Sequence, residues 1–162
     1  MGLAAGVLAS PQAASASTFN QADGLEWGVL DQSFNNLLGQ IKEATDALKP
    51  GQSNAIVEFV LLYMQLEALH ERTNHILSLV ALSSQFENAN DERRTLQVLG
   101  GMLLPSSKAL AQGKRSSLIK IGSATNVSGL YPHYVTSALT LIDTKVLPLI
   151  DKTAAKILAT DR

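Results

Sequence analysis

The fold is decided near the N-terminus by a stretch that reads WGVLDQSFNNLLGQIKEATDAL over residues 27–48. Apolar residues recur there at alternating steps of three and four, at Trp27, Leu30, Phe34, Leu37, Ile41, Ala44 and Leu48. Because this spacing follows the helical turn, it places these side chains on one face. The stretch therefore predicts an amphipathic helix. Lys49-Pro50-Gly51 ends it, since proline and glycine both oppose continuation.

The same periodicity predicts three more helices in the remainder of the chain. The second runs from about Asn54 to Asn88, and its buried face consists of Leu62, Leu66, Leu69, Thr73, Ile76 and Val80. The third runs from about Asp91 to Ser123, and the last begins at about Pro132, because proline suits the first turn of a helix. No stretch alternates as a strand with hairpin turns does. The prediction is an all-α, up-down-up-down four-helix bundle, with residues 17–162 as a single domain.

Two prolines lie inside predicted helices. Proline removes one backbone hydrogen bond and clashes with the preceding turn. Pro105 therefore predicts a kink near Leu104, or two helices with Ser106 capping the second. Pro148 predicts a bend around Thr144.

Residues 1–16 read MGLAAGVLASPQAASA and match the second half of a secretory leader. An apolar run, Leu3–Ala9, precedes Pro11 and the small residues Ala14-Ser15-Ala16. No lysine or arginine occurs before Lys42, so a disordered tail rich in alanine and serine is the alternative. The leader interpretation predicts export, to a bacterial periplasm or to the thylakoid lumen. The apolar run is too short for a transmembrane helix, which needs ~20 residues.

Composition excludes several classes of chemistry. The chain of 162 residues has no cysteine, which excludes disulfides, thiolate metal sites and cysteine nucleophiles. Its net charge of −1 gives no electrostatic basis for general nucleic-acid binding. The charge is unevenly divided, because the first 81 residues are net negative and the last 81 are net positive. We expect the two halves to attract each other on folding, although single surface pairs are weak.

The best candidate for a metal site is Glu67-Ala-Leu-His70 with Glu71. A glutamate and a histidine three residues apart share a helix face and could bind one ion. Di-iron bundles need a second Glu-x-x-His, which this sequence lacks. The favoured interpretation is therefore no metal and no cofactor, with His70 hydrogen-bonded at the edge of the buried face. For haem, Met64, Met102 and His133 are the candidate ligands, but we expect the methionines to fill the core.

Three groups of residues are candidates for binding a protein partner. Lys108, Lys114 and Arg115 gather on the third helix, where they form either an anion-binding site or a solvated face. Tyr131, His133 and Tyr134 form either an aromatic cap at one end of the bundle or an exposed docking site. The stretch 55–69 is apolar over more of its circumference than a bundle helix needs, so it is either the central helix or a partner surface.

The leader ending at Ala16 and the four-helix pattern over about Asp23–Thr160 together resemble the extrinsic photosystem II subunits of the PsbQ type. That resemblance implies a lumenal, non-enzymatic helical bundle that docks on a membrane complex. It covers architecture and leader but no specific motif. It also departs from the family, because Ser17–Gly24 lacks the family's proline-rich segment and the chain carries less charge.

Three functional hypotheses follow from the sequence. The first is a non-enzymatic exported accessory subunit docked on a larger assembly. The second is a periplasmic metal- or cofactor-binding bundle that uses Glu67, His70 and Glu71. The third is an inhibitor or immunity protein for a secreted enzyme.

Overall fold

The computed structural model describes residues 17–123 and 131–160, which form four helical rods and no strand. The first two rods are α3 (Gln21–Asp46) and α4 (Ser53–Ser83), joined through a 3₁₀ turn at Pro50–Gln52. The third rod consists of α5 (Ala89–Val98), a π-helical turn (Leu99–Leu103) and α6 (Leu104–Gly122). The fourth consists of α7 (Tyr131–Leu141), a second π-helical turn (Ile142–Val146) and α8 (Leu147–Thr160). The predicted leader, residues 1–16, lies outside the described residues.

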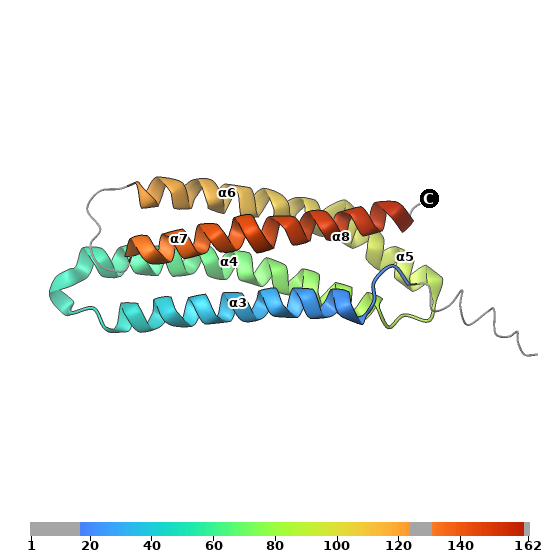
Figure 1. The fold of residues 1–162 in the computed structure, drawn as a ribbon, viewed down its shortest axis with the longest axis horizontal. Coiled ribbons are helices and arrows are strands. Elements are labelled where there is room, and N and C mark those ends of the chain that lie inside the picture. The colour runs from blue at the N-terminus through green and yellow to red at the C-terminus, as the bar shows by residue number, and fades with distance from the viewer. Residues whose placement is uncertain (1–16, 124–130, 161–162) are drawn as a thin grey trace, which may run out of the picture.

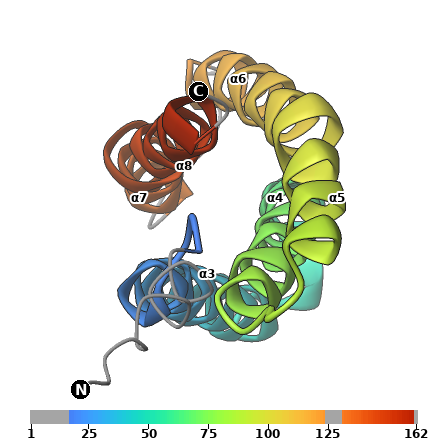
Figure 2. The same ribbon diagram turned by 90° about the vertical axis from the view of Figure 1, so that its right-hand side faces the viewer.

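The rods form an up-down-up-down bundle, as predicted (Figure 1). Each rod packs beside the next along the chain, and α7 returns to contact α3. Viewed along the bundle, the rods surround a shared core, with α3 and the α7–α8 rod as the first and last members of the ring (Figure 2). The first and last rods therefore meet along one seam.

The predicted apolar faces form this core. Trp27, Leu30, Phe34, Leu37 and Ile41 of α3 are buried. All six predicted positions on the second helix are buried as well. The predicted end of that helix was wrong, because α4 ends at Ser83 and a polar turn leads to Asn88, whose side chain accepts a hydrogen bond from the Asn90 N–H. Periodicity thus located the buried faces more precisely than the helix ends.

Both internal prolines follow a π-helical turn. The Leu104 N–H bonds to the Leu99 carbonyl, and the Leu147 N–H bonds to the Ile142 carbonyl, each five residues back. Widening the turn accommodates a proline without ending the rod. The interruptions lie where they were predicted, and α5 bends away from the line of α6 (Figure 1). The Ser106 alternative was wrong, because no side chain caps α6.

Polar side chains fasten the end of the bundle where α3 begins. Asn20 and Asp23 form a reciprocal capping box. The Asp23 carboxylate also accepts hydrogen bonds from Lys156 Nζ at 2.6 and 2.8 Å, although its side chain is only 10% exposed. The buried Trp27 Nε1–H donates to Thr153 Oγ1 at 3.1 Å. The contacts of Asp23 and Trp27 join the first rod to the last, and the Asp23–Lys156 pair links an acidic residue of the first half of the chain to a basic residue of the second.

No helix in the described ranges is both long enough and apolar enough to cross a membrane.

Candidate functional site

His70 is held by neighbours on the first rod. Its Nε2 lies 2.6 Å from Asp31 Oδ1, and its ring stacks on Phe34 with centroids 5.1 Å apart. The side chain is 14% exposed. This confirms the interpretation of His70 as a hydrogen-bonded residue at the edge of the buried face.

The other proposed metal ligands do not gather around His70. Glu67 and Glu71 are exposed, and nowhere in residues 17–123 and 131–160 do three or more metal-binding side chains come together. The expectation for the methionines was wrong, because Met64 and Met102 are 57% and 68% exposed. They lie on the outer surface, so neither fills the core. Among the described residues, no group of three metal-binding side chains includes His70, and neither methionine is enclosed in the core.

Tyr131 and Tyr134 form the aromatic cap rather than an exposed docking site. Both are buried and meet the Phe59 ring edge to face, at centroid distances of 5.2 and 6.0 Å. Burial, assisted by the nearby charge of Glu58, raises the pKa of Tyr131 to about 12. Of the three residues in this aromatic group only His133 is exposed, so the docking interpretation was wrong for the two tyrosines.

The basic group on the third rod is partly used within the bundle. Lys108 pairs with Asp151 at 2.9 Å, and Arg115 pairs with Asp143 at 2.7 Å. The hydrogen bond that Arg115 donates to the Asp143 carboxylate raises the pKa of Arg115. Both pairs join α6 to the last rod. The basic group is therefore not only a solvated face, because two of its side chains form ion pairs within the bundle. Lys114 has no ion pair with another described residue.

The outer face of α4 carries a row of apolar side chains that no described residue covers. Val57, Val60, Leu61 and Met64 are between 42% and 57% exposed, and we call them the α4 stripe. They recur at steps of three, one and three residues, so they share one face of the helix. That face points away from the core, which Leu62 and Leu66 enter from the opposite side. The apolar face of residues 55–69 is therefore as broad as predicted, and part of it faces outward.

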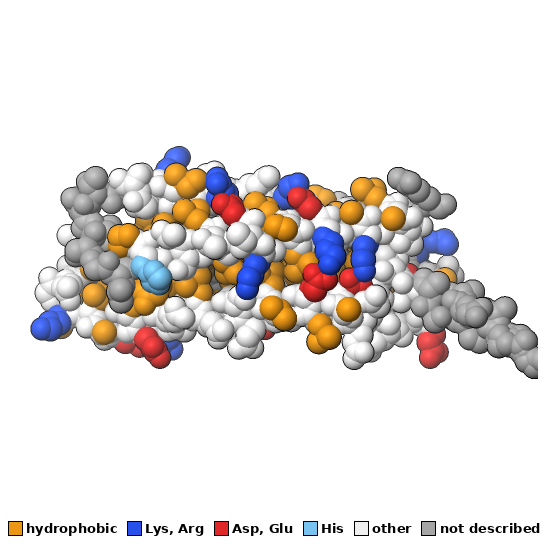
Figure 3. Space-filling model, in the orientation of Figure 1, with side chains coloured by type: hydrophobic (Ala, Val, Ile, Leu, Met, Phe, Trp, Pro, Cys, Tyr) orange, Lys and Arg blue, Asp and Glu red, His pale blue; other side chains and the backbone are white. Residues whose placement is uncertain are grey.

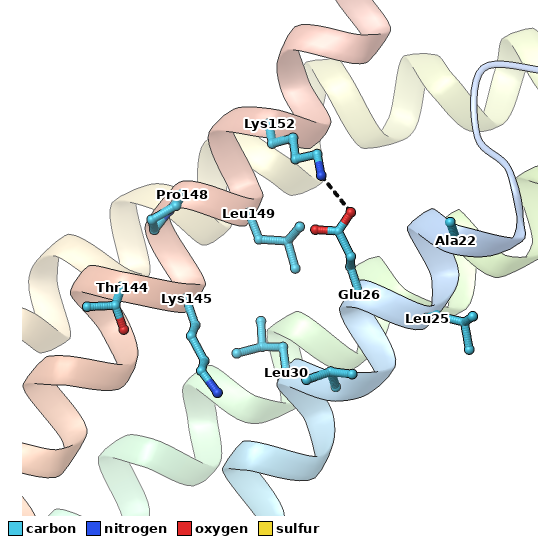
Figure 4. Close-up of a pocket in the computed structure, with 10 residues that line it drawn as sticks. Ala22, Leu25, Glu26, Leu30, Thr144, Lys145, Pro148, Leu149 and Lys152 are labelled. Carbon is cyan, nitrogen blue, oxygen red and sulfur yellow. Dashed lines mark hydrogen bonds and ion pairs between the residues drawn. The ribbon is translucent and has the colours of Figure 1, made fainter.

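A second apolar surface lies along the seam between the first and last rods. Figure 3 shows hydrophobic side chains exposed along this seam, with charged side chains crossing it. They line a hollow of about 460 Å³, which we call the α3–α8 groove. Its walls are Ala22, Leu25, Glu26, Val29 and Leu30 on α3, and Thr144, Lys145, Pro148, Leu149 and Lys152 on the last rod (Figure 4). The sequence reasoning missed this groove, because its two walls are more than 100 residues apart in the chain.

Two lysines reach across the groove from the last rod. Lys152 Nζ contacts Glu26 Oε1 at 2.6 Å, and this hydrogen bond raises the pKa of Lys152. Lys145 Nζ contacts only the Ser33 hydroxyl, at 3.1 Å, among the described residues. One end of the groove is therefore closed by a neutralised pair, and the other end carries a cation without a carboxylate.

No protein-family model, no curated protein and no solved structure matches this chain.

Proposed function

We propose that this protein is a non-enzymatic accessory subunit that docks on a larger protein assembly through the α4 stripe. The observation that carries the proposal is the exposure of Val57, Val60, Leu61 and Met64 on a helix whose opposite face is already buried. Fully burying one such side chain is worth roughly 1.5–3 kcal/mol. Because each is about half exposed, covering all four would contribute roughly 3–6 kcal/mol before the cost of association.

The compartment in this proposal is an exported one, either the thylakoid lumen or a bacterial periplasm. The leader-like residues 1–16 support this assignment. The four-rod architecture and its resemblance to the PsbQ type support a membrane protein complex as the assembly.

The test is rebinding to the assembly from the native source. Membranes stripped of the protein would be incubated with the parent chain, with Leu61→Glu/Met64→Glu, and with the control Ser78→Glu. Ser78 is exposed on the same helix but lies beyond the stripe. We expect the double variant to rebind at least tenfold more weakly, while Ser78→Glu rebinds like the parent.

Circular dichroism must show the same helicity and melting temperature for all three proteins, because the replaced side chains are exposed. Equal rebinding by the parent and the double variant refutes the role of the α4 stripe. A parent chain that migrates as a free monomer in the native extract refutes docking itself.

A further inference from the structure

The α3 wall of the α3–α8 groove has the spacing of a helix-packing ridge. Ala22, Leu25 and Val29 lie at steps of three and four residues, and Leu25 and Val29 are 66% and 60% exposed. Side chains at this spacing form the ridges that fit between the ridges of another helix. On the opposite wall, Thr144 and Pro148 repeat the four-residue step. The groove is thus bordered by two rows that match a third helix laid between them.

The dimensions of the groove suit a short helix rather than a small ligand. The α3 wall from Ala22 to Val29 is about 10 Å long, and the opposite wall from Thr144 to Lys152 is about 12 Å, at 1.5 Å per residue. This is two turns of helix on each side. A small apolar molecule could occupy the floor, but it would leave much of the Leu25 and Val29 side chains in water, because they are 66% and 60% exposed. A helix covers both the floor and the outer side, because helices pack at 8–10 Å.

The charges at the rim of the groove indicate the sign of the charge that a partner would carry there. Glu26 neutralises Lys152 at one end, and the nearby Asp31 is engaged by His70. Lys145 has no carboxylate within ion-pair distance among residues 17–123 and 131–160. The rim therefore presents one uncompensated cation beside an apolar floor. An acidic side chain on the partner would complement it.

We propose that the α3–α8 groove binds one amphipathic helix of a protein partner, with apolar residues at i, i+3 or i+4, and i+7 on the floor and an acidic residue against Lys145. This mode of recognition places the apolar stripe of a helix in a hydrophobic groove. The inference rests on the proposed function, because it assigns the docked protein a second contact. It places that contact on a different rod from the α4 stripe.

The test uses two synthetic helical peptides of about 18 residues that differ at one position. Both carry leucines at the stated spacing on an alanine-rich, capped background. One has glutamate in the position facing Lys145, and the other has lysine there. Each peptide bears a fluorophore, and its anisotropy is measured against the full chain and against Val29→Glu, Lys145→Glu and the control Leu61→Glu.

We expect the glutamate peptide to bind the parent chain saturably and at least tenfold more tightly than the lysine peptide. Val29→Glu should weaken that binding by about tenfold or more, because it places a charge on the apolar ridge. Lys145→Glu should reverse the preference between the two peptides. Leu61→Glu, which lies on the α4 stripe, should bind like the parent. Val29 is 60% exposed, so Val29→Glu should keep the parent's helicity and melting temperature.

Several outcomes overturn the proposal. Binding that does not saturate, or that Leu61→Glu weakens as much as Val29→Glu does, shows nonspecific association. A parent dimer that Val29→Glu dissociates in sedimentation assigns the groove to a second copy of this chain. Displacement of the peptide by micromolar decanoate assigns it to an anionic amphiphile. Peptide binding without rebinding to membranes would refute the proposed function alone, and rebinding without peptide binding would refute the groove alone.

Discussion

Replacing Asp23 with alanine is expected to destabilise the bundle by about 2–3 kcal/mol. The Asp23 carboxylate has two partners, the Asn20 N–H at 2.8 Å and Lys156 Nζ at 2.6 Å. Loss of a capping side chain typically costs about 1 kcal/mol. A hydrogen bond to a charged group contributes about 1.5–3 kcal/mol. The lower part of that range applies here, because the Lys156 side chain is 35% exposed and can turn towards water once its partner is gone.

The measurement is urea unfolding followed by circular dichroism at 222 nm, together with a thermal melt. For a chain of this length, 2–3 kcal/mol corresponds to a fall in Tm of roughly 5–10 °C. The matched control is Asp46→Ala, which removes an exposed acid at the other end of α3. It should be neutral or slightly stabilising, because a negative charge near a helix C-terminus opposes the helix dipole.

A double-mutant cycle separates the ion pair from the cap. Lys156→Met keeps most of the aliphatic stem, so the coupling energy between the two substitutions reports the pair. We expect about 1–2 kcal/mol of coupling. If Asp23→Ala costs less than about 0.5 kcal/mol, or no more than Asp46→Ala, the buried carboxylate does not fasten the first rod to the last and the reasoning fails.

Three further predictions concern the core, a close contact and a buried hydroxyl. Leu66→Asp should abolish cooperative unfolding in a thermal melt, because Leu66 is 0% exposed and the carboxylate would have no partner; a melt like the parent's would contradict the core assignment. Gly101→Ala should raise the free energy of unfolding by up to about 1 kcal/mol, and Gly100→Ala should gain less than Gly101→Ala, because an added Cβ at Gly100 lies 3.2 Å from Ile157 Cγ2 and one at Gly101 meets nothing within 4 Å. A urea midpoint for Gly101→Ala that is no higher than that for Gly100→Ala would refute this. Burial raises the pKa of Tyr131 to about 12 in the folded chain, against about 10 in the unfolded chain, so the unfolded state loses its proton first and the free energy of unfolding falls from pH 10 to 12. Tyr131→Phe should remove that part of the fall and the corresponding absorbance change at 295 nm. A variant whose stability and absorbance follow pH as the parent's do would refute this.

Periodicity predicted the fold because it depends on local spacing. Trp27, Leu30 and Phe34 occupy the buried face of α3 that their spacing indicated, and Leu66 lies at the centre of α4. The end of α4 at Ser83 was missed because helix ends depend on competing local hydrogen bonds. The prolines were recognised, but the π-helical turns before them were not. Whether a proline ends a helix or widens one turn depends on the packing around it.

The candidate surfaces were harder to predict because they join distant segments. The α4 stripe was visible as an excess of apolar residues within one helix. The α3–α8 groove forms only where Leu25 and Leu149 come together on adjacent rods, and no local sequence pattern shows that these two rods are adjacent. Its only local sign was the row of Ala22, Leu25 and Val29, which lies outside the face that Trp27 and Leu30 define. The capping box of Asn20 and Asp23 was not predicted, and neither was the ion pair of Asp23 with Lys156, because the pair joins residues from opposite ends of the chain.

The π-helical turn at Ile142–Val146 determines which way each side chain of α8 faces. A π turn is equivalent to one residue inserted into an α-helix, and each residue of an α-helix turns the chain by about 100°. If this turn became uniformly α-helical with all five of its residues kept, α8 would rotate by that amount. Thr153 would then leave Trp27, and Lys156 would leave Asp23. Deleting Thr144 together with the wide turn would instead keep α8 facing the same way, so the extra residue and the π turn must be lost or kept together if the two ends of the chain are to stay joined.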